Sequence, residues 1–292
     1  MRLLSLLRPA LLGAVLGLAA LRADRLVLVA GGEENQTGIP ATRAVLKEPF
    51  GVGFDATGQL FIIEMALGNR LLKVDAQGIL THVAGQGAPG DSGDGGPPLA
   101  AQFRGPHNLA VLPEGDVLVA DTWNGRVRRV SPGRDSVTSL PGFKVPAAQA
   151  RGSGPYCIAL DPTGSLLYVA DLHRVHGVEI KTGLTRIVAG NGQKGVPPDG
   201  AAAVEAPLVD PRAVAADHQG NIYILERGGH ALRVVDRAGK IRTVVNASGK
   251  KGATGDGGDA LAATMNGPTH LCIDRDDSVI IADAENHLIR RF

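Results

Sequence analysis

The chain has 292 residues, a formal net charge of +1 and only 3% aromatic residues. Such a small charge gives no general attraction to nucleic acid or acidic surfaces, and we expect no nucleic-acid partner. The 40 glycines and 18 prolines show no three-residue period, and 44% of the residues are hydrophobic. These values exclude collagen-like and disordered chains and favour a turn-rich globular domain.

The first 23 residues have the pattern of a targeting segment. Two arginines lie within the first eight residues, an uncharged apolar run follows at 9–21, and the small residue Ala23 ends the segment. The run is short for a bilayer span, which takes about 20 residues. The sequence therefore predicts a signal peptide at 1–23 and a secreted or periplasmic domain at 24–292. An uncleaved membrane anchor is the alternative, and we expect no other membrane insertion.

After this segment, short apolar runs alternate with turn signals. The run at 26–30 is apolar, β-branched and followed by glycines, which is typical of a strand. Further apolar runs, separated by polar or glycine-containing turns, lie at 50–54, 60–63, 71–74 and 79–84. The sequence therefore predicts a first unit of four short strands joined by tight turns.

The same order of strands recurs after four more prolines. The five prolines lie 49 to 57 residues apart, and each is followed 15 or 16 residues later by an acidic residue. The pairs are Pro49 and Glu64, Pro106 and Asp121, Pro155 and Asp171, Pro211 and Glu226, and Pro268 and Asp283. A period near 50 residues with four short strands per unit is the signature of a β-propeller. We predict an all-β propeller with five four-stranded antiparallel blades.

The count of strands also suggests how the ring closes. The fifth unit ends at Phe292 after its third strand, whereas the run at 26–30 belongs to no unit and resembles the fourth strands at 81–84 and 186–189. We expect the N-terminal strand to close the last blade and cover its open edge. The alternative is a six-bladed propeller truncated at the C-terminus.

The motifs within one unit resemble a known repeat. Residues 83–130 read VAGQGAPGDSGDGGPPLAAQFRGPHNLAVLPEGDVLVADTWNGRVRRV, and 252–292 repeat the pattern as GATGDGGDALAATMNGPTHLCIDRDDSVIIADAENHLIRRF. The VAG strand, GDGG loop, GP start, VAD or IAD strand and N-x-R strand resemble the bacterial form of the NHL repeat. The resemblance covers essentially the whole mature chain and is specific for the propeller fold, while the expectation of export rests on the segment at 1–23. Family members commonly have six blades, so five are a departure, as are LHRVHGVEI at 172–180 and ERGGH at 226–230.

One set of side chains is predicted to meet at the mouth of the central channel. The start of the first strand and the end of the second open on the same face of an antiparallel blade. The residues that follow the prolines therefore share a face, with two more directly behind them. The set is Phe50, His107, Tyr156, Arg212 and Thr269, with Asn108 and His270 behind. Because His, Tyr and Arg can hydrogen-bond or titrate, we expect a protein, glycan or small ligand to bind here; a solvated rim is the alternative.

The acidic residues at the ends of the second strands form a ring on the same face. Five carboxylates could bind a hard cation. However, an acid before a tight turn usually accepts backbone N–H bonds and pairs with an arginine such as Arg126 or Arg290. Because the acid recurs in every unit, we expect it to belong to the construction of the blade, and we expect no metal or other cofactor.

The segment at 105–111, GPHNLAV, also resembles part of a zinc-dependent amidating lyase built on this propeller. In that enzyme a His after the Pro is a metal ligand, but only His107 matches, and a catalytic zinc typically needs three protein ligands. The enzymatic alternative is a lactonase-like or amidating-lyase-like enzyme with His107 as base or ligand, Tyr156 as acid and Arg212 as anion clamp. We assign no catalytic residue and expect a monomeric, non-enzymatic binding scaffold.

Two further patterns have structural interpretations. Cys157 and Cys272 occupy the same element of different units, so we expect two buried thiols and no disulfide. The loop GDSGDGG at 90–96 resembles a serine-protease nucleophile loop, but its counterpart at 253–258 reads ATGDGG. We therefore assign its glycines to turns with positive φ.

Overall fold

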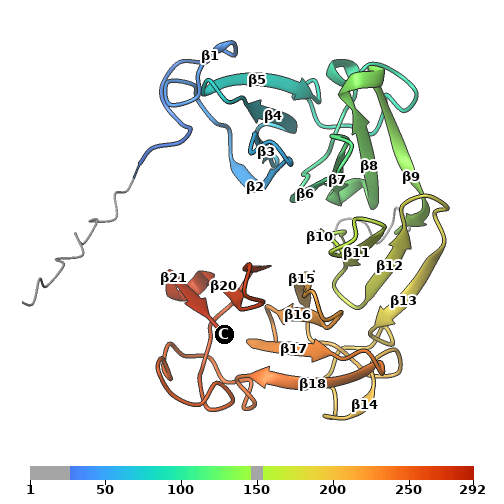
Figure 1. Cartoon of the computed structure of the whole chain (residues 1–292), viewed down its shortest axis with the longest axis vertical. Coiled ribbons are helices and arrows are strands. Elements are labelled where there is room, and N and C mark those ends of the chain that lie inside the picture. Colours follow the sequence, from blue (N-terminus) through green and yellow to red (C-terminus); the bar gives the residue numbers. More distant parts are fainter. Residues whose placement is uncertain (1–26, 146–153) are drawn as a thin grey trace, which may run out of the picture.

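The computed structural model describes residues 27–145 and 154–292. Their strands form five antiparallel sheets around a central axis, which is a five-bladed β-propeller (Figure 1). The fold class and the number of blades predicted from the sequence are thus confirmed. The predicted signal peptide at 1–23 lies outside the described residues. Within them, no helix is long and apolar enough to span a membrane.

Each blade starts with its innermost strand and proceeds outward. The first two blades are β2 (Pro49–Phe54), β3 (Leu60–Glu64), β4 (Arg70–Val74) and β5 (Ile79–Ala84), then β6 (Asn108–Val111), β7 (Val117–Asp121), β8 (Arg126–Ser131) and β9 (Ser136–Lys144). The third and fourth are β10 (Cys157–Leu160), β11 (Leu166–Ala170), β12 (Val175–Glu179) and β13 (Thr185–Ala189), then β15 (Pro211–Ala216), β16 (Ile222–Glu226), β17 (Ala231–Val235) and β18 (Lys240–Val245). The fifth has β19 (His270–Ile273), β20 (Val279–Asp283) and β21 (Leu288–Arg291).

Short elements extend or connect the blades. The two-residue strands β1 (Ile39–Pro40) and β14 (Ala201–Ala202) pair with the outer strands β5 and β18. The 3-10 helices are η1 (Pro98–Ala100), η2 (Thr122–Asn124), η3 (Pro132–Arg134) and η4 (Ala284–Asn286).

The apolar second and third strands are covered on both faces. All five residues of β7 and all five of β17 are buried. Hydrophobic clusters join neighbouring blades: Leu109 of the second blade packs with Phe61 and Ile63 of the first. Because burial of one such side chain contributes about 1.5–3 kcal/mol, the continuous apolar runs fix how the blades stack.

In four of the five blades, the acid at the end of the second strand ties the blade to the loop that precedes it. Glu226 is typical: its Oε1 accepts a hydrogen bond from the backbone N–H of Val209 at 2.6 Å, and its Oε2 accepts one from Arg233 Nε at 2.9 Å. Glu64, Asp121 and Asp283 make the same kind of backbone and arginine contacts. The structural interpretation of the acid ring, including the pairing with Arg126 and Arg290, is confirmed.

The third blade keeps the acid but changes its partner. Asp171 accepts hydrogen bonds from the backbone N–H groups of His173 and Arg174, at 2.7 and 2.6 Å. His176 Nε2 lies 2.9 Å from its second oxygen, where the other blades use arginine. The departure LHRVHGVEI therefore replaces the arginine by a histidine, and Asp171 bonds the backbone of the turn that follows its strand.

The expected closure of the last blade by the N-terminal strand is corrected by the structure. The fifth sheet has three strands, and residues 27–30 lie outside any strand. The Gly31 N–H donates instead to the carbonyl of Ala41 at 2.9 Å, and Ala30 packs on the cluster of the first blade. These contacts hold the segment on the side of the first blade, so Val27, Leu28 and Val29 are exposed.

The two cysteines differ in burial. Both are free, as expected, but only Cys157 is buried, and Cys272 is exposed, which corrects the expectation for the second thiol. The strand β10 packs between β6 and β15, whereas Leu271 and Ile273 turn one side of β19 toward the fourth blade. Cys272 lies on the other side of β19, and there it is exposed to solvent. Burial by two neighbouring blades raises the pKa of Cys157 to about 11.

The glycine-rich loops form turns, as the sequence predicted. Gly93 and Gly255 have φ angles of +98° and +99°. A Cβ atom on either would lie within 2.6 or 2.5 Å of the Cα of Ala101 or Ala263. Both the positive φ and the close approach require glycine, and the Ser of GDSGDGG is incidental to them.

Candidate functional site

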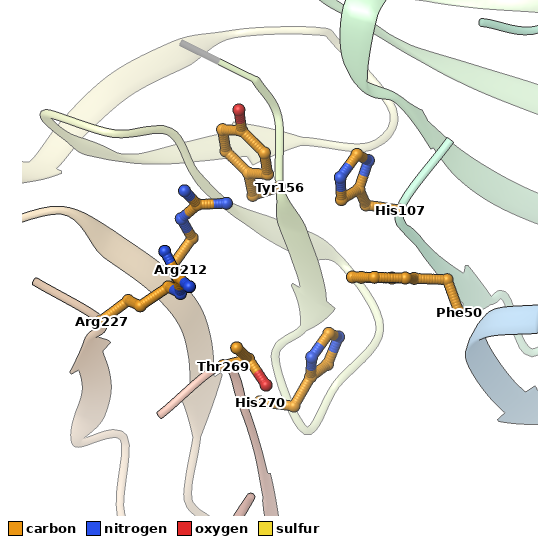
Figure 2. Close-up of a pocket in the computed structure, with 7 residues that line it drawn as sticks. All are labelled: Phe50, His107, Tyr156, Arg212, Arg227, Thr269 and His270. Carbon is orange, nitrogen blue, oxygen red and sulfur yellow. The ribbon is translucent and has the colours of Figure 1, made fainter. Parts of the chain in front are cut away.

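A cavity of about 360 Å³ lies at the mouth of the central channel (Figure 2). Its lining residues come from all five blades, and they are Phe50, His107, Tyr156, Arg212, Arg227, Thr269 and His270. Six of these belong to the set predicted from the sequence. Arg227 was not predicted, and Asn108 does not line the cavity. The size is within the range of small-ligand pockets, about 300–1,000 Å³.

Three of the lining residues occupy equivalent places at the start of the first strand. The backbone N–H groups of His107, Tyr156 and Thr269 donate to the carbonyls of Ala120, Ala170 and Ala282, at 3.2, 3.0 and 3.0 Å. Each acceptor lies near the end of the second strand of the same blade. This shared hydrogen bond turns the three side chains toward the channel.

Two other residues reach the cavity through irregular pairing. The register of β2 with β3 shifts between Pro49 and Gly51, and that of β15 with β16 shifts between Pro211 and Ala213. Phe50 and Arg212 are therefore the extra residues of two β-bulges. A bulge re-aims the side chain of its extra residue, and bulges are common next to functional sites. The sequence placed both residues at the mouth without showing this irregularity.

His270 also lines the cavity, although it directly follows Thr269. The sequence placed it directly behind Thr269 at the channel mouth, and in the structure both side chains line the cavity. Its Nε2 is buried and has no hydrogen-bond partner among the described residues. Burial lowers the pKa of His270 below its usual value, so the imidazole is neutral near pH 7. A buried polar atom without a partner is a place where a ligand or water can bind.

Aromatic rings form one continuous wall of the cavity. His107 lies edge-on to Tyr156 and to Phe50, with ring centroids 5.1 and 4.8 Å apart. Phe50 in turn lies 5.7 Å from His270, also edge-on. We call these four residues the aromatic belt. Phe50 is 43% exposed, so its ring offers apolar surface to the cavity.

Arg212 is held in place at one end of the aromatic belt. Its guanidinium carbon lies 4.0 Å from the centroid of the Tyr156 ring, and its Nε donates to Asp210 Oδ1 at 2.9 Å. Stacking on the ring and the hydrogen bond through Nε orient the guanidinium plane. Within the described parts of the chain, Nη1 and Nη2 have no protein acceptor.

Arg227 adds a second guanidinium beside the first (Figure 2). Its Nη2 donates to Glu285 Oε1 at 2.9 Å, and the two side chains are 40% and 53% exposed. Neither Glu285 nor Asp210 lines the cavity. The wall therefore presents two cations and no carboxylate to a ligand.

His107 is neutral and has one nitrogen free. Its Nδ1 lies 2.7 Å from the carbonyl oxygen of Gly105, which can only accept, so Nδ1 carries the proton and Nε2 is an acceptor. Burial is the main cause that lowers the pKa of His107 to about 4, and the positive charge of Arg212 adds to it. At neutral pH His107 can accept a hydrogen bond from a ligand.

Asn108 does not line the cavity, and its side chain bonds the neighbouring blade. It is buried, and its Oδ1 accepts a hydrogen bond from the backbone N–H of Ile158 at 3.1 Å. The amide thus links the second blade to the third. Arg227 could have been found from the sequence, because it directly follows the acid Glu226 on the same face of the blade.

We also searched the described residues for side chains that could hold a metal ion. The described residues hold no group of three or more His, Cys, Asp or Glu side chains placed to bind a metal ion. The carboxylates at the ends of the second strands are occupied by backbone and arginine hydrogen bonds.

Family models match most of the described chain. Residues 92–254 match the model of the Teneurin NHL domain, and residues 265–292 match that of the NHL repeat. The chain belongs to the Teneurin NHL domain family. This establishes the NHL repeats inferred from the sequence motifs.

The curated relatives are animal proteins that are much longer. Teneurin-1 of Homo sapiens is 27% identical over 221 residues, covering 67% of this chain and 8% of that protein. Teneurin-3 of Mus musculus is 30% identical over 214 residues, covering 63% and 8%. The chain spans less than a tenth of the length of these relatives. Their animal sources do not establish the bacterial origin that the form of the repeat suggested.

Solved structures share the fold at low sequence identity. An auxiliary nutrient binding protein from Bacteroides thetaiotaomicron superposes with a TM-score of 0.65 at 17% identity, covering 86% of this chain and 60% of that chain. Virginiamycin B lyase from Staphylococcus aureus superposes with a TM-score of 0.53 at 14% identity, covering 84% and 70%. The fold thus occurs in a binding protein and in an enzyme, and function must be argued from the site.

Proposed function

We propose that this NHL propeller is a binding module and that the cavity at its channel mouth holds a small ligand. The observation that carries the proposal is the convergence of seven side chains from five blades on one cavity, several with polar atoms that no described residue occupies. The aromatic belt and the few polar groups that converge on the cavity match the usual composition of a ligand pocket. The fold shared with a nutrient binding protein is compatible with this function.

The mouth suits binding better than proton transfer. A general base works best with a pKa near the operating pH, whereas that of His107 is about 4. We therefore retain the non-enzymatic function inferred from the sequence over the hydrolase or lyase alternative. We also propose that the protein acts outside the cytoplasm, as the signal-peptide pattern at 1–23 suggests.

The test is a small-molecule screen read by the histidine ring signals in NMR. If the proposal holds, bound compounds shift the signals of His107 and His270 more than those of histidines elsewhere, such as His218. The variant Phe50→Ala should lose these shifts while keeping its fold, because Phe50 is 43% exposed and belongs to no buried cluster of the described residues. Hits that bind Phe50→Ala and the unaltered chain equally would contradict the proposal.

A further inference from the structure

The two arginines and the aromatic belt specify more than a generic pocket. We propose, building on the proposed function, that the ligand of the channel mouth is a planar aromatic carboxylate, with its carboxylate on Arg212 and its ring against Phe50.

The first step concerns the free atoms of Arg212. Its Nε is occupied by Asp210 and one face of its guanidinium covers Tyr156, which leaves Nη1 and Nη2 as the available donors. Figure 2 shows this end of the guanidinium among the lining side chains. Two parallel N–H groups in a fixed plane match the two oxygens of a carboxylate. Because the plane is already fixed, little side-chain entropy is lost when the anion binds.

The second step concerns the sign of the charge. Arg227 lies beside Arg212, and both carboxylates that pair with these arginines stay outside the lining. His107 and His270 are neutral at pH 7, so they neither repel a cation nor attract an anion strongly. The guanidinium groups therefore decide the preference, which is for an anion over a cation.

The third step concerns the shape of the ligand. The aromatic belt runs from Tyr156 to His270, and Phe50 is its most exposed ring. The face of Tyr156 is already stacked with Arg212, so a ligand ring must pack on Phe50. In Figure 2 Phe50 lies across the cavity from Arg212 and Arg227. A ligand with a flat apolar body and an anionic end fits both walls, since aromatic pairs favour edge-to-face or offset contact.

The fourth step concerns the acceptor on His107. Its Nε2 lone pair points away from the bonded Nδ1 and has no protein donor among the described residues. A hydroxyl or N–H group on the ring of the ligand could donate to this atom. The inference therefore favours hydroxylated or N–H-bearing aromatic acids among the aromatic carboxylates.

The experiment compares two probes of the same shape, one of which is an anionic carboxylate and the other a neutral amide. 2-Naphthoate and 2-naphthamide are titrated into the purified full-length chain at pH 7, and binding is followed by calorimetry and by the ring signals of His107 and His270. We expect 2-naphthoate to bind at least about tenfold more tightly, because only the anion forms charge-assisted hydrogen bonds. Arg212→Met should abolish this preference without lowering the melting temperature by more than a few degrees.

The control variant lies in the same blade. Arg242 is exposed on the outer strand β18, away from the cavity, and Arg242→Met should keep the full preference for the anion. Equal binding of both probes, or a preference that survives Arg212→Met, would overturn the carboxylate inference but leave a ligand pocket in place. Failure of both probes to shift either histidine would overturn the inference together with the proposed function.

Discussion

Two neighbouring residues, Glu226 and Arg227, show how architecture and site differ at the channel mouth. Glu226 is fully buried, and both of its oxygens accept hydrogen bonds from the protein. The Arg227 side chain is 40% exposed, lines the cavity and forms an ion pair with the exposed carboxylate of Glu285. The acid recurs in every blade, whereas the arginine occurs at this place in one blade only. Repeated polar residues build the blades, and residues that break the repeat provide the site.

The same contrast holds for the two rings of residues on this face. The acids at the ends of the second strands are satisfied within the protein. At the starts of the first strands, several side-chain atoms have no partner among residues 27–145 and 154–292: Nη1 and Nη2 of Arg212, Nε2 of His107 and Nε2 of His270. We therefore expect the acid ring to determine stability and the mouth residues to determine binding.

The largest expected effect is on the acid ring. Replacement Glu226→Ala leaves the buried Arg233 without its carboxylate and should lower the free energy of unfolding by about 3–5 kcal/mol. The matched control is Glu285→Ala, which removes an exposed partner of Arg227 and should cost about 0–1 kcal/mol. Urea denaturation measures both. Similar losses in the two variants would remove the distinction between buried and exposed acids.

The second largest effect that we expect is a pH dependence of the free energy of unfolding, caused by His107 at the channel mouth. The pKa of His107 is about 4 in the folded protein and about 6.5 when unfolded, so the unfolded chain binds a proton first as the pH falls. Stability is therefore complete above pH 6.5 and should fall by about 3 kcal/mol between pH 6.5 and pH 4 through this group. The charged or titratable groups that face it are Arg212, His270, Glu48 and Tyr156.

His107→Gln provides the comparison for this pH dependence. Glutamine can donate to Gly105 but does not titrate, so the variant should lose less stability between pH 6.5 and pH 4 than the unaltered chain. Denaturant unfolding at a series of pH values measures the difference. Parallel curves for the two proteins would show that His107 is not buried as a neutral ring.

We expect the smallest effect on stability at Arg227, the residue that follows Glu226 in the sequence. Arg227→Met removes a side chain whose only ion pair is exposed, so the free energy of unfolding should change by less than about 1 kcal/mol. The same variant should weaken binding of 2-naphthoate, since it removes one of two cations from the wall. A destabilisation as large as that of Glu226→Ala would place Arg227 in the architecture.

Features with a regular period could be predicted from the sequence, because local pattern and repetition determine them. The regular spacing from each Pro to its acid, repeated along the chain, predicted the blades, their number and the position of the channel mouth. The side of the ring on which residues 27–30 lie depends on contacts of Ala30 and Gly31 with the first blade, far from any periodic signal. The exposure of Cys272 likewise depends on which neighbours cover β19.

The sequence likewise predicted some residues of the candidate site and not others. The residues after the prolines were placed correctly at the cavity, where the shared hydrogen bond to the second strand orients three of them and a β-bulge orients each of the other two, Phe50 and Arg212. Asn108 has the right residue type but is bonded to Ile158, a contact between blades that one repeat cannot reveal. Arg227 carries no repeated signal, because an arginine follows the acid in one of the five units only.

The most direct test of the account is the NMR titration of the His107 ring with and without 2-naphthoate, assigned by comparison with His107→Gln. The account predicts a pKa of about 4 for the free protein. It also predicts a higher pKa in the presence of the probe, because an anion on Arg212 stabilises the protonated ring. A pKa near 6.5 that the probe leaves unchanged would contradict both the buried neutral ring and the anion site.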